Sequence, residues 1–312
     1  MRGHIIKRGK SSYTVVLNMG KDPSTGKRNQ QWISVKGNKK DAEKRLSEML
    51  HQIDTGSFMR PGKTTVAEFL ERWLNDCRPR LSPRGFERYS GIVAGHLIPD
   101  FGSITLTQLR PEHIQKHETA IQERGLSART ARYHHAVIHS ALKEAVKWGL
   151  LARNPADAVT PPKIQRTDMQ TWDEGEMRRF LEAAKGSMYY ELFFLALCTG
   201  MRRSELLALR WQDINLDMGQ VSVSRTMHHL KDGRYVYTEP KSDNSRRTIA
   251  LSPSAILLLK DYRQRQALTR AELGSVQKDA DLVFCHILDG SPLRPNSITR
   301  AWQTAARGAG SR

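Results

Sequence analysis

The hydrophobic residues near the start of the chain come in short runs that alternate with turn residues. β-prone runs at residues 3–7, 12–17 and 31–35 are separated by glycine-containing turns, which predicts a three-stranded meander. Residues 39–53 then place apolar side chains at helical spacing, with a glycine just beyond them as a stop. The first part is therefore predicted to be a small sheet with one helix over one face.

From residue 64 to residue 159 the apolar residues follow a helical repeat throughout. Pro111 stands where one helix begins, and Ser127 is a suitable N-cap for a long helix that reaches Trp148. We expect the aromatic residues of these stripes to pack in a core. The pattern predicts a bundle of four or five helices.

The last part of the sequence mixes both patterns and is predicted to be a mixed, mainly helical α/β region. The expected helices are one opened by a capping box at Thr171–Glu174, then residues 190–198 and 204–211, one starting at Ser252, and residues 295–306. The expected strands are residues 221–223, 235–238 and 247–251, which alternate as a meander does, and a last one at 282–284.

Two segments with proline, residues 57–63 and 154–163, are typical of linkers between these parts. The predicted fold class is therefore multidomain α+β. Its domains are a three-stranded sheet plus helix over residues 1–60, an all-α domain over 64–160 and a mixed α/β domain over 165–312.

The charge of the chain indicates what it binds. It has 50 Lys and Arg against 32 Asp and Glu, a net charge of +18. This excess is divided as +8 over residues 1–60, +5 over 61–163 and +5 over 164–312. A protein that wraps a long polyanion with several folded modules distributes its charge in this way, so nucleic acid is the predicted partner. The alternatives are a ribosomal or RNA-binding protein, or a solvated basic surface on an unrelated one.

Several other classes of protein are excluded by the same sequence. The longest apolar stretch, near residues 192–198, is well short of the roughly 20 residues that a membrane span needs, and no apolar signal core follows Met1. We therefore expect a cytoplasmic protein without a membrane partner. The three cysteines, Cys77, Cys198 and Cys285, are far apart and odd in number, which argues against a disulfide framework or a zinc site. No metal or cofactor is expected.

Arg202 is the first residue that the sequence marks for chemistry. It follows a glycine turn between two apolar helices, an unusual place for a charge. An arginine offers a phosphate a rigid, permanently charged fork, which suits the stabilisation of a phosphoryl transition state. The alternative is an ion pair with Glu205, three residues later on the same helix. Spacing alone does not choose between these two hypotheses.

Further basic residues lie at turns. Lys241 lies in a polar turn between two predicted strands, from which a lysine can reach a DNA backbone and donate a proton to a leaving oxygen. Its alternative is a solvated turn lysine. In the first sheet, the face without a helix carries basic residues near its strands and turns, and such a face can lie on phosphates or enter a groove. These residues are Lys7, Arg8, Lys10, Lys27 and Arg28.

The order of the parts is more specific than any one of them. A sheet-plus-helix domain, a helical bundle, then TGMRRSELLALRW and EPKSDNSRRTIAL resemble the tyrosine recombinases of phages and mobile elements, the integrase family, over nearly the whole chain. The resemblance implies an arm-site-binding domain over residues 1–60, a SAM-like core-binding domain over 64–160 and a catalytic domain over 165–312.

The resemblance also assigns roles to the marked residues. It implies that Arg202 grips the scissile phosphate, that Lys241 protonates the leaving 5′ oxygen and that Glu205 buttresses the arginine. Arg203 stays open as an alternative clamp. Intact members of the family integrate and recombine DNA by cutting and rejoining strands through a phosphotyrosine.

The sequence departs from the family pattern in its last part. The family also uses a His-x-x-Arg motif, a later His or Trp, and a tyrosine nucleophile on a C-terminal helix. No His-x-x-Arg occurs in these 312 residues, and the last tyrosine, Tyr262, precedes the final predicted strand. We therefore expect a C-terminally truncated integrase whose catalytic domain is incomplete, so that the chain alone is catalytically incompetent.

These observations define what we expect the chain to do. It binds double-stranded DNA at core and arm attachment sites in a bacterial host cell, and it forms an oligomer with itself on that DNA. The alternative is a non-catalytic DNA-binding remnant or regulator that occupies attachment sites. A third, weaker hypothesis is an RNA-binding basic protein.

Overall fold

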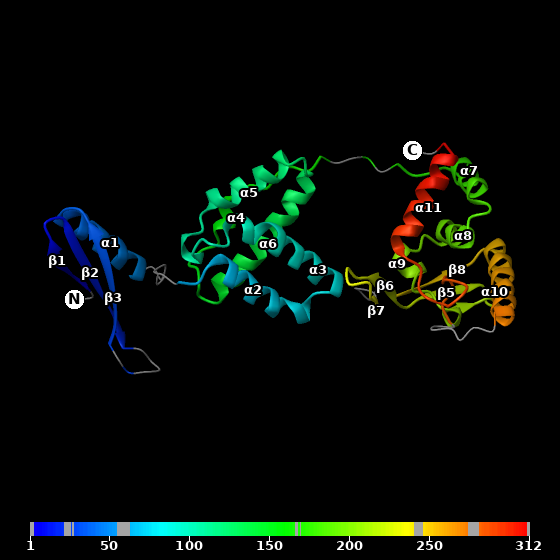
Figure 1. The fold of residues 1–312 in the computed structure, drawn as a ribbon, viewed down its shortest axis with the longest axis horizontal. Helices are drawn as coiled ribbons and strands as arrows, with labels where there is room; N and C mark the ends of the chain where they lie inside the picture. Colours follow the sequence, from blue (N-terminus) through cyan, green and yellow to red (C-terminus); the bar gives the residue numbers. More distant parts are fainter. Residues whose placement is uncertain are drawn as a thin grey trace. The chain divides into compact units, whose positions relative to one another are not determined.

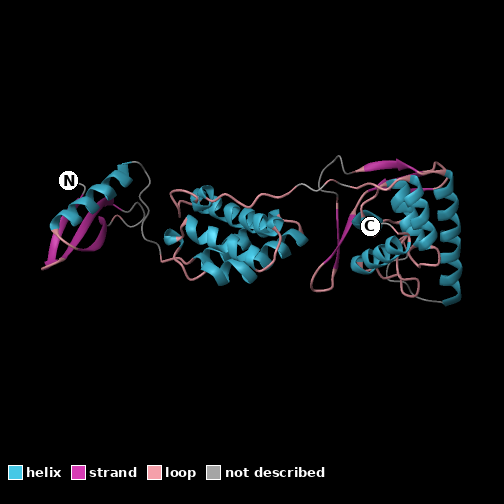
Figure 2. Ribbon diagram, turned by 90° about the horizontal axis from the view of Figure 1, so that it is seen from above, coloured by secondary structure: helices cyan, strands magenta, loops and turns pink. Residues whose placement is uncertain are grey.

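The computed structural model describes residues 3–21, 26, 28–54, 63–165, 168, 170–239, 246–273 and 281–310. The chain divides into two compact units, Met1–Arg80 with Arg88–Gln165 and Leu81–Glu87 with Arg166–Arg312. Strands occur near the N-terminus and in the last part, with helices between them in sequence, so the predicted α+β class is confirmed (Figure 2). The domain boundaries drawn from the sequence stay predictions.

The N-terminal sheet has the predicted meander order. Its strands are β1 (Gly3–Gly9), β2 (Ser12–Lys21) and β3 (Arg28–Lys36), and the helix that follows is α1 (Lys39–Asp54). Both strand pairs are antiparallel in the order β1-β2-β3, and α1 lies across one face (Figure 1). Val15 and Leu17 point to that face because side chains alternate along a strand, and they are buried against Ala42 and Met49.

All regular elements between residues 63 and 165, a range that the structure describes throughout, are helical. They are α2 (Val66–Cys77), η1 (Arg78–Arg80), α3 (Pro83–Ile92), the π-helical turn η2 (Val93–Leu97), α4 (Ile98–Phe101), η3 (Leu106–Gln108), α5 (Pro111–Glu123), α6 (Ala128–Lys147) and η4 (Pro155–Ala158). Ser127 caps α6 as predicted, since its Oγ accepts from the Thr130 amide at 3.2 Å. Phe69 and Trp73 are buried, in agreement with their expected place in the core.

The last part contains helices and two small sheets (Figure 1). Its elements are α7 (Glu174–Ala184), α8 (Tyr190–Thr199), α9 (Arg203–Leu206), η5 (Trp211–Asp213), β4 (Ile214–Asn215), β5 (Gln220–Val223), β6 (Thr226–His229), β7 (Tyr235–Thr238), β8 (Arg247–Ala250), α10 (Pro253–Leu273) and α11 (Pro295–Gly308). The Trp302 ring of α11 packs 4.3 Å from that of Phe180 on α7. No helix in the described part of the chain is both long and apolar enough to cross a membrane.

The predicted meander in this part is wrong. β5 pairs directly with β8 in a sheet of order β4-β5-β8, and β6 with β7 forms a separate two-stranded ribbon inserted between them in sequence. Val221 and Val223 face the core from β5, and Ile249 of β8 packs against the same core. Alternation identified most of these strands, but it does not specify which strand pairs with which.

Three other predictions need correction. The helix expected at 204–211 is the single turn α9, after which i→i+3 bonds such as that from the Ala208 amide to the Glu205 carbonyl take over. The expected strand at 282–284 is a buried loop with isolated bridges, because its apolar residues fill the core without a paired strand. The capping box uses Asp173 and Glu176 in place of Thr171 and Glu174.

Candidate functional site

A sharp turn at the end of α8 places Arg202 at the start of α9. Gly200 has φ +62° and ψ +18°, and its amide donates to the Ala196 carbonyl at 3.0 Å. Glycine adopts this left-handed conformation without the Cβ clash that other residues meet. The Thr199 hydroxyl accepts from the Met201 amide at 3.3 Å and thereby holds the next residue of the turn. The chain then enters α9 with Arg202 as its N-cap.

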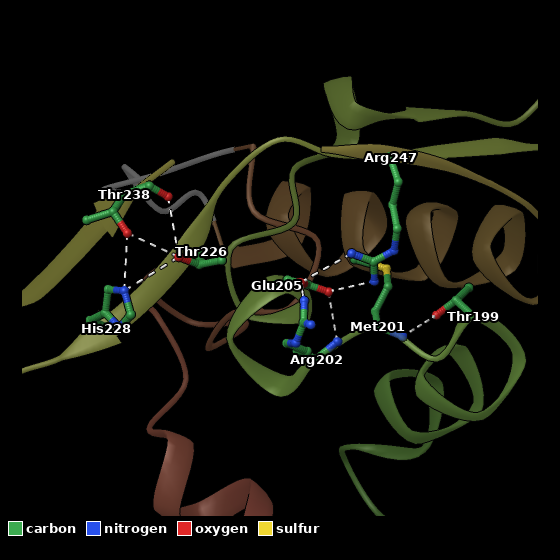
Figure 3. A network of polar contacts seen from close by, with 8 residues as sticks. All are labelled: Thr199, Met201, Arg202, Glu205, Thr226, His228, Thr238 and Arg247. Carbon is green, nitrogen blue, oxygen red and sulfur yellow. Dashed lines mark hydrogen bonds and ion pairs between the residues drawn. The ribbon is translucent and has the colours of Figure 1, made fainter. Parts of the chain in front are cut away.

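Arg202 and Glu205 form the ion pair that their spacing allows, and the pair leaves the arginine exposed. Glu205 Oε1 accepts from Arg202 Nη1 and Oε2 accepts from the Arg202 amide, both at 2.9 Å (Figure 3). The Arg202 side chain is 69% exposed, whereas that of Glu205 is 1% exposed. The carboxylate therefore holds the backbone of Arg202 and one terminal nitrogen of its guanidinium, while the side chain stays exposed to solvent.

A second arginine, which the sequence analysis missed, binds the same carboxylate. Arg247 of β8 donates from Nη2 to Glu205 Oε2 at 2.9 Å and from Nη1 to Oε1 at 3.3 Å (Figure 3). Each carboxylate oxygen thus accepts one bond from each arginine. The alternation of β8 could have indicated this contact, because it places Arg247 on the same, less exposed face of the strand as Ile249. The other two positions of β8, Thr248 and Ala250, are exposed.

Glu205 stays ionised in this setting. Burial raises its pKa, but the hydrogen bonds from Arg247 and Arg202 outweigh burial and hold the pKa below the usual 4.5. Glu205 and the two arginines that bind it, Arg202 and Arg247, form a triad. One carboxylate between two guanidiniums gives this triad a net charge of +1. With Arg202 alone the pair would be neutral, so the second arginine, Arg247, gives the group the net positive charge that favours an incoming anion.

The structure places some of the other predicted residues and not others. Lys241 and Lys27 lie outside the described residues. Arg203 turns to α11, where Nη1 donates to the Pro295 carbonyl at 3.2 Å and to the Thr299 hydroxyl, so it joins α9 to α11. Four predicted DNA-binding residues of the first sheet are exposed in the first unit, and these are Lys7, Arg8, Lys10 and Arg28.

The β6–β7 ribbon carries a second polar cluster next to this site. α9 packs against β6, which brings the ribbon beside the triad. Thr238 Oγ1 lies 3.1 Å from both the Thr226 hydroxyl and His228 Nε2 (Figure 3). The described residues contain no group of three or more His, Cys, Asp or Glu side chains arranged to hold a metal ion. Hydroxyls, an imidazole and guanidiniums are groups that contact phosphate oxygens.

The turn at Gly200 can be tested by substitution. Gly200→Ala is expected to lower the free energy of unfolding by about 1–2 kcal/mol, because an L-residue at φ +62° is strained whatever the space around it. The measurement is thermal unfolding of the full chain by calorimetry. The control is Gly308→Ala in the same unit, where a new Cβ would meet only an ordinary contact at 3.7 Å from Ala183. Equal stability of the two variants would contradict a requirement for the left-handed turn.

The chain is similar in sequence to known phage integrases and a tyrosine recombinase. The profile of the phage integrase N-terminal SAM-like domain matches residues 65–118, and that of the phage integrase family matches residues 170–312. A tyrosine recombinase XerC-like protein of Caldanaerobacter subterraneus subsp. tengcongensis is 28% identical over 287 residues, covering 87% of this chain and 73% of that protein.

Two solved structures are similar in fold. One is the Tn1549 transposon integrase in complex with a circular intermediate DNA, with a TM-score of 0.62 at 18% identity over 74% of each chain. The other is a lambda integrase tetramer bound to a Holliday junction, with a TM-score of 0.56 at 16% identity over 99% of this chain and 81% of that one.

Proposed function

The chain belongs to the phage integrase family of tyrosine recombinases, and on that basis we propose that it binds double-stranded DNA at attachment sites as part of site-specific integration or recombination. The observation that carries the proposal is the exposed Arg202 fork fixed on a buried, ionised Glu205. Such a fork is preorganised to bind the oxygens of one phosphodiester.

We assign the chemical roles in the site as follows. Arg202 binds the scissile phosphate, and Glu205 keeps its guanidinium in place. Lys241 lies between the end of β7 and the start of β8, and we propose that it protonates the leaving 5′ oxygen. All three roles use protein side chains only, and the proposed function includes no cofactor.

The other parts of the chain are proposed to hold the DNA. The helical domain binds the core site, and the first sheet binds arm sites through Lys7, Arg8, Lys10, Lys27 and Arg28. The three-way division of the net charge of +18 supports this arrangement. The solved relatives on circular intermediate DNA and, as a tetramer, on a Holliday junction support an oligomer on DNA. We propose that this assembly forms in the bacterial cytoplasm.

We further propose that these 312 residues by themselves bind DNA without cutting it. They contain no His-x-x-Arg motif, and the tyrosine nearest their end, Tyr262, packs against the rings of Trp211 and Phe284. Burial raises the pKa of the Tyr262 hydroxyl, with further contributions from Cys285 and Glu191. A buried phenol with a raised pKa is a poor nucleophile. A DNA-binding regulator that occupies attachment sites fits the same observation.

A nicked suicide duplex that carries inverted repeats tests both proposals. We expect the 312-residue chain to retard the duplex in a native gel and to leave no protein–DNA adduct after denaturation in SDS. Arg202→Ala is expected to weaken the native complex several-fold through loss of one charge-assisted phosphate contact. An SDS-resistant adduct would overturn the non-cutting proposal, and tighter binding to RNA than to this duplex would overturn the DNA assignment.

A further inference from the structure

A groove lined by arginines lies on the Arg247 side of the Glu205 carboxylate. Its volume is about 660 Å³, and it lies over β5, β8 and the end of β7. Four arginines line it, Arg210, Arg225, Arg246 and Arg247, together with three hydroxyl side chains. Arg247 thus belongs both to the triad at Arg202 and to the wall of this groove.

The guanidiniums of the groove are fixed in place by contacts with the protein. Arg247 is held by Glu205, and Arg210 donates to the two Asp213 oxygens at 2.9 and 3.0 Å. Arg225 Nε donates to the Ala208 carbonyl at 2.7 Å, and its Cζ lies 4.4 Å from the centroid of the Tyr237 ring. Side chains that are already ordered lose little entropy when a ligand binds.

The charges of the groove are arranged to favour an anion. Its lining has four arginines and one carboxylate, that of Glu239, which pairs with Arg246 on the rim. The side chains of Glu205 and Asp213 are less exposed than the arginines they hold, so an incoming anion meets the guanidinium N–H groups before it meets these carboxylates. Arginine forks and serine and threonine hydroxyls are among the groups that contact the sugar–phosphate backbone of DNA.

We propose that this groove is a second phosphate-binding site, which takes a backbone phosphate of the bound DNA in addition to the one at Arg202. The inference rests on the proposed DNA-binding function. The two sites are adjacent, because Arg202 and Arg247 share one carboxylate. A DNA strand presents phosphates at regular short intervals, so neighbouring phosphates of the bound DNA can occupy both sites.

Arg246→Ala tests the groove with little risk to the fold, since its side chain is 57% exposed. The measurement is fluorescence anisotropy of a labelled duplex of inverted repeats titrated with the full chain at several salt concentrations. We expect roughly three- to tenfold weaker binding and a salt slope smaller by about 0.9, the value for one phosphate contact. Arg178→Ala is the matched control, because Arg178 is also exposed and paired with one glutamate, Glu174. It is expected to bind like the wild type.

The double variant Arg202→Ala with Arg246→Ala separates a second site from an indirect effect on the first. Two independent contacts predict a salt slope smaller by about 1.8. A double variant that keeps the slope of Arg202→Ala alone would mean that the groove acts only through Arg202, which contradicts the inference. Wild-type slope and affinity for Arg246→Ala would also contradict it while leaving DNA binding intact. Failure of the wild-type chain to bind the duplex would overturn the proposed function itself.

Discussion

Glu205→Gln is expected to lower the free energy of unfolding of the unit that contains Arg202 by about 3 kcal/mol. The wild-type carboxylate is 1% exposed and accepts four hydrogen bonds from Arg202 and Arg247. Glutamine offers one acceptor oxygen and turns an amide N–H₂ toward guanidinium donors, so at least two of these bonds are lost. Two positive charges are then left without their counter-ion.

The size of this effect follows from burial. Removing one partner of a buried ion pair costs about 3–5 kcal/mol, and the lower end applies because both arginines keep some contact with water. The measurement is thermal unfolding of the full chain by calorimetry. Glu174→Gln serves as the control, since Glu174 pairs with Arg178 on an exposed helix surface. We expect its effect to stay within about 0.5 kcal/mol.

The same substitution is also expected to weaken DNA binding, because Arg202 loses the contacts that fix its fork. A drop of about tenfold in affinity corresponds to the loss of one well-oriented charge-assisted contact. Unchanged stability and affinity in Glu205→Gln would show that the carboxylate has no structural part in the site.

Lowering the pH from 7 to 4 is expected to destabilise the helical part, α2 to α6, by about 3 kcal/mol through His134. His134 is buried on α6, where Nδ1 lies 3.2 Å from His117 Nε2 and the ring lies 4.7 Å from that of His96. His117 Nδ1 in turn bonds to Asp100. Burial, then the neighbouring His96 and His117, lower the pKa of His134 to about 4, and Asp100 opposes this only in part.

The direction of the effect follows from proton linkage. An unfolded chain takes up the proton near the ordinary pKa of 6.5, whereas the folded chain takes it up only near 4. The stability contributed by neutral His134 is therefore complete above about pH 6.5 and is lost as the pH falls toward 4. The difference between the two pKa values is equivalent to about 3 kcal/mol. That is a large share of the free energy of unfolding of a typical domain, which is about 5–15 kcal/mol.

Urea unfolding of the full chain at pH 7 and pH 4, with hydrogen exchange of α6 peptides as the local probe, measures this loss. His134→Asn keeps a polar atom near Nδ1 but takes up no proton, so it is expected to be less stable at pH 7 and to lose about 3 kcal/mol less than the wild type on acidification. His139→Asn is the control, because His139 is 38% exposed and bonds to Asp157 at 2.8 Å. Full acid sensitivity in His134→Asn would assign the effect to other groups.

Local patterns were sufficient to identify most of the elements. β-prone runs between glycine-containing turns predicted β1, β2 and β3, and an N-cap serine with a following helical stripe predicted α6, because these signals lie within a few residues of each other. The glycine turn before Arg202 was equally local. The short apolar run at 282–284 was not decided in this way, since a buried loop and a buried strand have the same composition.

The sequence by itself determined the family of the protein, its basic charge and the position of Arg202, because each depends on residue identity or on contacts a few residues apart. Only the tertiary structure decided that Arg247 binds Glu205, 42 residues away, and that an arginine groove continues from that pair. Both depend on the direct pairing of β5 with β8 past the β6–β7 ribbon. Strand pairing is a long-range choice that is made by packing of whole faces, and no local pattern contains it.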